Sequence, residues 1–353
     1  MTDTAPARIT IGQLHDVARG YVKTALLRTA LELRLFDLLA DQVNDPKTIA
    51  GKVGADPRGI RILLDGLAGI GLVSSGGGDG YALLPGSEDL LVSTGAHYFG
   101  NAMKLSASDW EWDAQKNLID AVRHGGTVTE THALTPQFDF WEDFAEHTSW
   151  FNNGAADLMA EQLVPWAAYR DTVEVLDVAC SHGSYGFSFA RREPRARITG
   201  LDWPNVLEVT ARNAERLGLS DRVEFIAGDM FTTPLGGPYD IVMLTNVLHH
   251  FSEERATELL KRIRTAVKPG GRIAVVGHTF DEHDTPETNP LPYMFSLIML
   301  VQTPDGETHS VATYQRMLEA AGFTDFQTHS GEKAMHRLFL AERPAEEPGQ
   351  AAG

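Results

Sequence analysis

The chain has 353 residues, 43% of them hydrophobic, which is enough for two domains or one large one with a substantial core. It carries 30 Lys and Arg against 48 Asp and Glu, a formal net charge of −18. This charge disfavours partners held mainly through phosphate contacts, such as nucleic acid or an anionic membrane. The one cysteine, Cys180, excludes an internal disulfide framework and a cysteine-based zinc cluster. Because the sequence also lacks an apolar run of membrane length and a signal-peptide core, we expect a soluble cytoplasmic protein.

The first part of the chain, from Ile11 to about Val92, has a helical pattern with short turns. Asp45 and Asp56 each precede a proline, which predicts two short helices that begin at these residues. The glycine-rich "SSGGGDGYALL" then predicts a hairpin tip. Helices followed by a hairpin give a winged-helix outline. Because the segment is mildly acidic, we expect it to serve dimerisation or to cover a substrate rather than to bind DNA.

We assign residues 1–95 to this domain, 96–345 to a helical substrate-lid segment and a catalytic domain, and 346–353 to a disordered tail. The helices between about 93 and 170 contain many aromatic side chains, most of which we expect in the core. Two of them, Trp150 and Phe151, are predicted to line a substrate pocket. A later helix over "YMFSLIML" is predicted to turn Met294, Phe295 and Met299 toward the substrate.

From Val173 the pattern changes to alternating strands and helices. The predicted strands are "VEVLDVA", "ARITGLDW", "RVEFIAGD", "YDIVMLTNV" and "GRIAVVGHTF". This alternation predicts an α/β domain with a mostly parallel sheet and helices on both faces. Ligands of such sheets bind beyond the carboxyl ends of the strands, so the residues that follow each strand carry the candidate site.

The turn after the first of these strands has small residues where a dinucleotide-binding turn has glycines. Ala179 and Ser181 would crowd a pyrophosphate, and glycine stands only at Gly183 and Gly186. The turn therefore favours a cofactor without a pyrophosphate. Asp177 is predicted to bind that cofactor through water or to cap the turn. Cys180 is expected to be a small core residue rather than a reactive thiol.

The next strand ends favour an adenosine ligand. Asp202 is placed to accept hydrogen bonds from both ribose hydroxyls, with Trp203 beside it. Asp229 is predicted to reach the adenine amino group and Met230 to cover the ring, and Asn246 is predicted to contact the cofactor after the fourth strand. An adenosine without pyrophosphate in an acidic setting indicates S-adenosylmethionine, whose sulfonium is cationic.

Two histidines follow the fourth strand in "TNVLHHFSEE". His249 is the candidate proton acceptor, since an imidazole titrates near neutral pH. His250 or Glu307 is predicted to orient the ring of His249. The alternative for His249 is a packing role. Although histidines 182, 249, 250, 278, 283 and 309 are numerous, none has the tight spacing of metal ligands on a predicted helix, and we expect no metal site.

Several strings in the chain, in their order and spacing, resemble those of the bacterial and plant-type small-molecule O-methyltransferases that depend on S-adenosylmethionine. The strings are "LELRLFDLLA", "LLDGLAGIGLV", "LDVACSHGS", "LDWPNV", "GDMF", "NVLHHFSEE", "VKPGG" and "MLEAAGF". The resemblance covers about Gly20 to Leu340. It implies a homodimer with a mainly α winged-helix dimerisation domain ahead of a Rossmann-like class I methyltransferase domain that has a mostly parallel seven-stranded sheet.

The resemblance also assigns residues. It places the ribose carboxylate on Asp202, the adenine contact on Asp229 and the catalytic base on His249, with His250 where the family usually has Asp. The family's helper acid falls on Thr308, one residue after Glu307.

We therefore expect methyl transfer to a hydroxyl of an aromatic or polyketide-like small molecule, with S-adenosylhomocysteine as the second product. Three alternatives remain open at this point: methyl transfer to carbon, a non-methylating relative that keeps the cofactor for a cyclisation or elimination, and a winged-helix regulator.

Overall fold

The structure is a computed structural model that describes residues 8–76, 80–136, 138, 140–148, 153–330 and 336–345. The predicted tail at 346–353 and the predicted pocket residues Trp150 and Phe151 lie outside these ranges. The chain forms two compact units, Met1–Glu111 and Trp112–Gly353. The proposed boundary after residue 95 stays a prediction.

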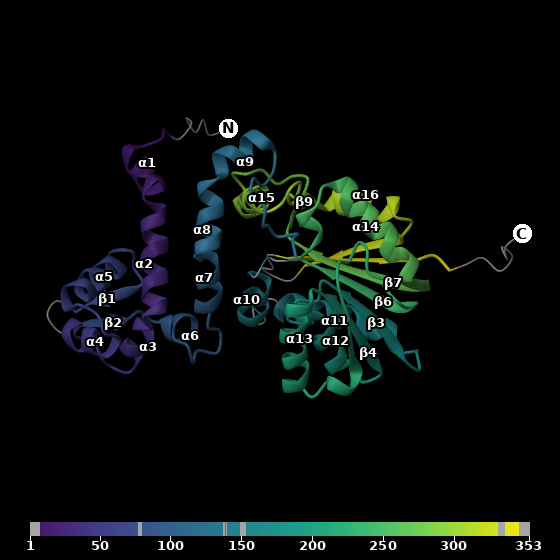
Figure 1. The fold of residues 1–353 in the computed structure, drawn as a ribbon, viewed down its shortest axis with the longest axis horizontal. Coiled ribbons are helices and arrows are strands. Elements are labelled where there is room, and N and C mark those ends of the chain that lie inside the picture. The colour runs from purple at the N-terminus through teal and green to yellow at the C-terminus, as the bar shows by residue number, and fades with distance from the viewer. Residues whose placement is uncertain are drawn as a thin grey trace, which may run out of the picture. The chain divides into compact units, whose positions relative to one another are not determined.

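The first unit is mainly helical (Figure 1). Its helices are α1 (Ile11–Ala18), α2 (Gly20–Glu32), α3 (Leu35–Ala40), α4 (Pro46–Val53), α5 (Pro57–Gly69), α6 (Ser87–Leu91) and α7 (Gly100–Ser106), and α8 (Asp109–Lys116) begins in it. Strands β1 (Val73–Ser75) and β2 (Tyr81–Leu83) pair antiparallel, which confirms the predicted hairpin. The predicted helix starts are also confirmed, because the Asp45 and Asp56 side chains accept hydrogen bonds from backbone amides in the first turns of α4 and α5.

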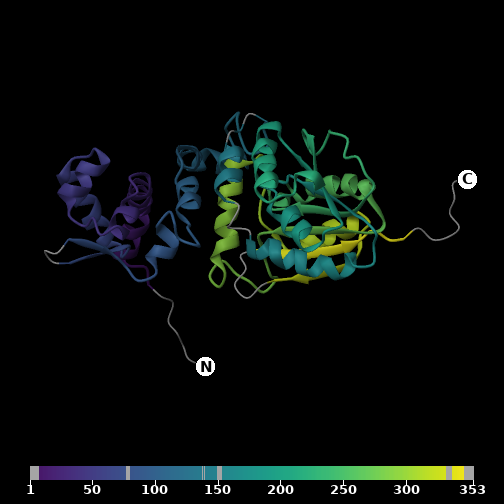
Figure 2. The ribbon, with the colours of Figure 1, turned by 90° about the horizontal axis from the view of Figure 1, so that it is seen from below.

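The second unit is built around one seven-stranded sheet (Figures 1 and 2). Its strands are β3 (Val173–Val178), β4 (Ala196–Asp202), β5 (Val223–Ala227), β6 (Tyr239–Thr245), β7 (Val267–Gly277), β10 (Thr324–His329) and β11 (Arg337–Glu342). The order across the sheet is β10-β11-β7-β6-β3-β4-β5. Strands β3 to β7 run parallel to one another, and β11 runs antiparallel to both β7 and β10. The predicted α/β fold is confirmed.

Helices cover both faces of this sheet, as the alternating pattern predicts. One face packs on α11 (Asn153–Ala167), α12 (Ser184–Arg192) and the end of α13 (Pro204–Arg216). The other packs on α14 (Glu253–Ala266) and α16 (Val311–Ala320). The remaining elements are α9 (Leu118–His124), α10 (Phe140–His147), α15 (Pro290–Gln302), the 3-10 turns η1 (Ser220–Arg222) and η2 (Leu248–His250), and the short pair β8 (Thr279–Phe280) and β9 (His309–Ser310).

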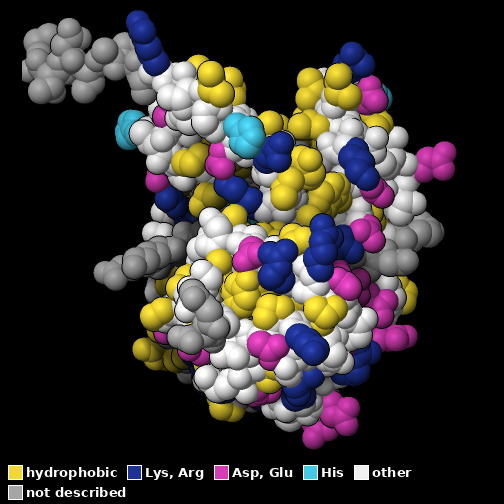
Figure 3. Space-filling view, turned by 90° about the vertical axis from the view of Figure 1, so that its left-hand side faces the viewer, with side chains coloured by type: hydrophobic (Ala, Val, Ile, Leu, Met, Phe, Trp, Pro, Cys, Tyr) yellow, Lys and Arg dark blue, Asp and Glu magenta, His cyan; other side chains and the backbone are white. Residues whose placement is uncertain are grey.

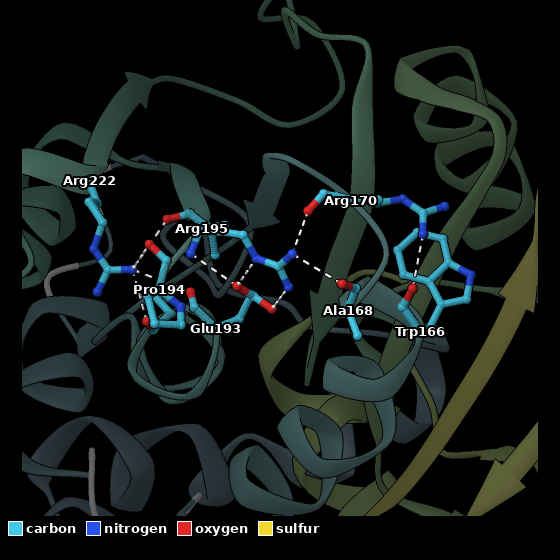
Figure 4. A network of polar contacts seen from close by, with 9 residues as sticks. Trp166, Ala168, Arg170, Glu193, Pro194, Arg195 and Arg222 are labelled. Carbon is cyan, nitrogen blue, oxygen red and sulfur yellow. Dashed lines mark hydrogen bonds and ion pairs between the residues drawn. The ribbon is translucent and has the colours of Figure 1, made fainter.

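A polar network fixes the loops near the starts of β3 and β4 (Figure 4). Arg195 forms a two-pronged ion pair with the buried Glu193 and also donates to the carbonyls of Ala168 and Arg170. Arg222 donates to four backbone carbonyls around the end of α12. Cations satisfy the unpaired carbonyls at a helix carboxyl end, so this network is structural.

Basic and acidic side chains are interspersed on the face of the molecule shown in Figure 3. In the winged-helix segment, Arg61 of α5 pairs with Asp65, whose carboxylate also accepts a hydrogen bond from the Tyr81 hydroxyl. This arrangement differs from the continuous basic surface that nucleic-acid binding requires. Among the described residues, no helix has the length and apolar character needed to cross a membrane.

Candidate functional site

The candidate site lies where the order of the sheet reverses. Strand β3 pairs with β4 on one side and with β6 on the other. After β3 the chain adds β4 and β5 on the first side of β3, and then adds β6 and β7 on the second side. In open parallel sheets the crevice beyond the strands at such a reversal binds ligands. The turn after β3, Asp202 at the end of β4, and Asn246 after β6 therefore meet at this edge.

The turn after β3 keeps the backbone shape of a glycine turn without the glycines. Ala179 and Ser181 have φ angles of 54° and 50°, in the left-handed region that L-residues rarely adopt. Gly183 has φ 77°, and a Cβ atom there would lie 2.3 Å from the Phe187 ring, so glycine is required at this position. The turn thus adopts left-handed backbone at two positions that carry side chains. Cys180 is buried, as expected of a core residue.

Asp202 ties the ends of β3 and β4 together. Its two carboxylate oxygens accept hydrogen bonds from the backbone amides of Ser181, at 2.8 Å, and Trp203, at 2.7 Å. Burial raises the pKa of Asp202 to about 6, although the two amides oppose the shift. A buried carboxylate with a raised pKa and spare acceptor capacity is a good acceptor for ligand hydroxyls.

Asp177 is the second buried carboxylate at this edge. Its Oδ2 accepts a hydrogen bond from the Gly186 amide at 3.1 Å, while its buried Oδ1 has no hydrogen-bond partner. Burial raises the pKa of Asp177 to about 7. The contact with Gly186 agrees with the capping role predicted for Asp177, and the open Oδ1 leaves room for the ligand role as well.

Asn246 follows β6 with a left-handed φ of 54°. Its backbone amide donates to the carbonyl of Val276 at 2.7 Å, and its side-chain amide donates to the hydroxyl of Tyr185 at 3.1 Å. The side-chain oxygen Oδ1 is buried without a partner. Tyr185 thus adds a hydroxyl to the site that the sequence analysis did not identify, because nothing in the turn pattern distinguishes a buried tyrosine of α12 from a core residue.

The residues predicted to contact the adenine lie near the ends of β4 and β5. Asp229 accepts a hydrogen bond from the Phe231 amide at 2.9 Å and shapes the turn after β5. Met230 is half-buried, and its carbonyl accepts from Arg262 at 3.0 Å. Trp203 stands at the start of α13, half-buried, and packs against the cluster of Ala145, Val206 and Val209. Asp229, Met230 and Trp203 remain predicted cofactor contacts.

His249 lies in η2, directly beyond β6, and is only 3% exposed. Its ring centroid is 4.6 Å from that of His250, 4.9 Å from Phe295 and 5.8 Å from His278. Its Nδ1 atom is buried without a hydrogen-bond partner. Burial, and after it the neighbouring histidines, hold the pKa of His249 well below its usual value.

The structure does not bring the two predicted orienting residues into hydrogen bonds with His249. The Nδ1 atom of His250 lies 3.1 Å from the Val247 carbonyl, and its ring makes an edge contact with Trp141 at 5.4 Å. Glu307 is exposed, whereas His249 is buried. The prediction that Glu307 orients the imidazole is therefore corrected: its loop presents this carboxylate to solvent.

Helix α15 brings one of its three predicted pocket residues to His249. Phe295 contacts both His249 and His278, at 4.9 and 4.3 Å between ring centroids. Met299 is buried at 2% exposure, and Met294 is 59% exposed, because it lies about 100° around the helix from Phe295. That Met294 and Met299 contact the substrate stays a prediction.

Sequence reasoning missed the site neighbours Trp141 and His336. The His336 ring lies 4.4 Å from that of His278. His278 follows β7 directly, so the rule about residues beyond strand ends could have found it, whereas Trp141 and His336 come from segments with no such signal. In the described part of the chain, no set of three or more His, Cys, Asp or Glu side chains is arranged to hold a metal ion.

Four buried polar atoms at this edge lack hydrogen-bond partners: Asp177 Oδ1, Ser181 Oγ, Asn246 Oδ1 and His249 Nδ1. Buried polar atoms in native proteins are almost always paired, so several orphans in one place indicate a ligand. Three of the four atoms are oxygens that can accept hydrogen bonds: a carboxylate oxygen of Asp177, the amide oxygen of Asn246 and the hydroxyl oxygen of Ser181. They suit a ligand rich in hydroxyl and ammonium donors, which fits S-adenosylmethionine.

Comparisons with known proteins agree with this site. A family model described as the O-methyltransferase domain matches residues 115–324, and the model of the O-methyltransferase dimerisation domain matches residues 15–93. A protein from Nostoc punctiforme assigned to the O-methyltransferases has a similar structure, with 31% identity over 95% of this chain and 100% of that chain, and a TM-score of 0.87.

Two further proteins are similar over nearly their whole length. Human N-acetylserotonin methyltransferase, solved in complex with S-adenosylmethionine, is 26% identical over 97% of this chain and 100% of that chain, with a TM-score of 0.80. The tetracenomycin polyketide synthesis 8-O-methyl transferase TcmO of Streptomyces glaucescens is 27% identical over 90% of this chain and 92% of that protein. The chain therefore belongs to the O-methyltransferase family whose members use S-adenosylmethionine, with the family's dimerisation domain ahead of the catalytic domain.

Proposed function

We propose that the protein methylates a hydroxyl oxygen of an aromatic or polyketide-like small molecule, with His249 as the acceptor of the hydroxyl proton. The observation that carries this proposal is the position of His249. His249 follows strand β6, three residues after Asn246. Its ring is buried, and the Nδ1 atom has no hydrogen-bond partner. A proton acceptor at the edge of the sheet that holds the cofactor residues is what methyl transfer to a hydroxyl requires.

The residues proposed to hold the cofactor are those that close the carboxyl edge of β3, β4, β5 and β6: Asp177, Ala179, Ser181, Gly183, Asp202, Trp203, Asp229, Met230 and Asn246. Asp202 would accept from the ribose hydroxyls, since it is the buried carboxylate at the end of β4. Asp177 and Asn246 each offer an unpaired oxygen for the methionyl ammonium group. When bound, the cofactor supplies an electrophilic methyl group on a cationic sulfur.

The chain's own residues then have two tasks. His249 takes the hydroxyl proton at a ring nitrogen, which leaves a more nucleophilic oxygen. Two aromatic side chains exclude water and hold a flat acceptor: Phe295, which contacts His249, and Trp141, which contacts His250. Holding two reactants in line accounts for much of the rate in such reactions.

The similarity to TcmO, whose name describes an 8-O-methyl transfer in polyketide synthesis, supports oxygen as the methylated atom and a polyketide-like acceptor. Methyl transfer to carbon and a cyclisation without methyl transfer are the competing reactions. A winged-helix regulator has less support, because Arg61 of α5 is paired with Asp65 of the same helix.

We also propose that two copies of the chain associate through the first unit. The dimerisation model matches residues 15–93. Helices α1 and α2 expose large apolar side chains in the first unit, including Ile11 at 87%, Val17 at 81% and Tyr21 at 62%. Large apolar side chains exposed on two successive helices are typical of a surface that another protein covers.

The experiment supplies cofactor labelled with carbon-13 on its methyl group together with hydroxynaphthalenes and hydroxyanthraquinones. The proposal predicts products heavier by one methyl group and a carbon-13 resonance typical of a methoxy carbon. A resonance typical of a methyl group on carbon would establish the first competing reaction. An acceptor converted without gain of mass, with the cofactor unconsumed, would establish the second.

A further inference from the structure

The surroundings of His249 differ from those of an ordinary catalytic imidazole. The rings nearest to it are His250, Phe295 and His278, with His336 behind His278. Among the described residues, no carboxylate bonds to either of its ring nitrogens, and Nδ1 is buried without a partner. The titratable groups that act on it are four histidines: His250 of η2, His278 after β7, His309 of β9 and His336 before β11.

A histidine that acts as a strong base usually has a second group that bonds to its other nitrogen. That group fixes the tautomer and stabilises the imidazolium that forms. Here Thr308 stands where the family resemblance places an acid, and the Thr308 hydroxyl is itself buried without a partner. Glu307 is exposed, and Asp305 faces Arg255 at 3.9 Å. None of these three supplies a carboxylate to His249.

The lack of a carboxylate partner for His249 in the described part of the chain has a quantitative consequence for its strength as a base. A simple phenol has a pKa of about 10 and free histidine about 6.5, so this proton transfer is uphill by more than three powers of ten. Burial and four neighbouring histidines lower the pKa of His249 further, which makes the imidazole a still weaker base. An acidic hydroxyl removes this barrier, because its pKa approaches that of the imidazole.

We propose that the acceptor hydroxyl of this enzyme is an acidic one, of the hydroxyquinone or enolised β-dicarbonyl class, and that it transfers its proton to His249 on binding. This inference rests on the proposed function and specifies its substrate. The O–H bond breaks and an N–H bond forms at His249, which leaves an oxyanion paired with an imidazolium. The oxyanion then forms a bond to the methyl carbon as the bond from that carbon to sulfur breaks, and the proton leaves His249 for solvent.

The same cluster of rings suits an anionic oxygen. A carboxylate next to His249 would repel an oxyanion, whereas neutral imidazole N–H groups donate hydrogen bonds to it and the imidazolium formed at His249 attracts it. Phe295 and Trp141 supply flat apolar surfaces at this cluster, of the kind that a conjugated ring system packs against.

The test uses 2-naphthol and a series of fluorinated 2-naphthols, which share one skeleton and differ in acidity, together with 2-hydroxy-1,4-naphthoquinone. At pH 7 and saturating cofactor, kcat/KM is expected to rise at least tenfold from 2-naphthol to the most acidic member. The absorbance of the acidic members bound to the enzyme with S-adenosylhomocysteine is expected to be that of the anion at a pH below their solution pKa. A value of kcat/KM that is equal across the series, or highest for 2-naphthol, overturns the inference.

A pair of variants separates this inference from the proposed function. His249→Gln is expected to lower turnover with every acceptor, whereas His283→Gln changes an exposed histidine and is expected to leave turnover unchanged. If His249→Gln turns over like wild type, the proposed base is wrong whatever the acidity trend. If His249→Gln is impaired but the wild type prefers 2-naphthol, only the inference about acidic acceptors fails.

Discussion

At the scale of single residues, the turn after β3 shows small side chains in a conformation that glycine normally adopts. Ala179 and Ser181 both have φ near 50°. Each such residue costs roughly 1–2 kcal/mol relative to a right-handed conformation. The Ser181 hydroxyl is also buried without a partner in the cofactor-free chain. The turn is therefore less stable than its glycine-containing counterpart, and the hydroxyl is available to a ligand.

Replacing Ser181 by glycine tests this strain. We expect Ser181→Gly to raise the free energy of unfolding of the cofactor-free protein by about 1 kcal/mol, because it relieves the left-handed backbone and removes an unpaired hydroxyl. Urea unfolding measures the change. The control is Ser188→Gly inside α12, where glycine also removes hydrogen bonds to Asp157 and Arg192 and should lower stability by about 2 kcal/mol. A loss of stability in both variants would contradict the account.

Asp202 is the residue on which cofactor binding should depend most. We expect Asp202→Ala to weaken S-adenosylmethionine binding at least a hundredfold, about 3 kcal/mol, because the carboxylate is proposed to bind ribose and also holds the Ser181 amide. Isothermal titration calorimetry measures the affinity. Asp221→Ala, at an exposed position of η1, is the control and should bind like wild type. Unchanged affinity of Asp202→Ala would remove Asp202 from the site.

At the scale of the elements, the sequence predicted the strands β3 to β7, their mostly parallel arrangement and the residues that follow them, but it did not locate β10 and β11. It succeeded there because Val- and Ile-rich runs and capping residues such as Asp45 and Asp56 act locally. It placed Phe295 at the substrate but could not predict that Trp141 and His336 join the same cluster of rings. These two residues come from distant segments, and tertiary packing alone decides whether they meet.

The hydrogen bonds of Arg222 to backbone carbonyls lie at the other end of the sheet, near the starts of β3 and β4. We expect Arg222→Ala to lower the free energy of unfolding by about 2 kcal/mol, because it leaves several carbonyls around the end of α12 without a donor. Cofactor affinity should stay unchanged, since the site lies at the opposite strand ends. Arg216→Ala, which loses one bond to Asn213, is the control. A parallel loss of affinity in Arg222→Ala would show that the two ends are coupled.

At the scale of the whole molecule, buried titratable groups determine how stability depends on pH. Burial lowers the pKa values of His182, His250 and His336 to about 4, and that of His249 also falls. Between pH 4 and 6.5 the folded chain thus binds fewer protons at these histidines than the unfolded chain does, so their contribution to stability rises with pH. Two buried carboxylates act in the opposite direction, because their pKa values are raised to about 7 and about 6.

The four histidines outnumber the two carboxylates in this window. We therefore expect the free energy of unfolding of the cofactor-free protein to rise by roughly 3 kcal/mol from pH 4.5 to pH 6.5. Urea unfolding at half-unit steps of pH measures the profile. Stability that falls steadily across the window would mean that the histidine cluster is hydrated rather than buried.

In the proposed function, the residues beyond β3 and β4 bind the cofactor and His249 accepts the proton. The most direct measurement is turnover of His249→Gln beside its affinity for S-adenosylmethionine, with an acidic naphthol as acceptor. We predict that kcat falls by two to three powers of ten while the dissociation constant of the cofactor stays within about twofold of wild type. Turnover at the wild-type rate would contradict the account and leave alignment of the two reactants as the only source of catalysis.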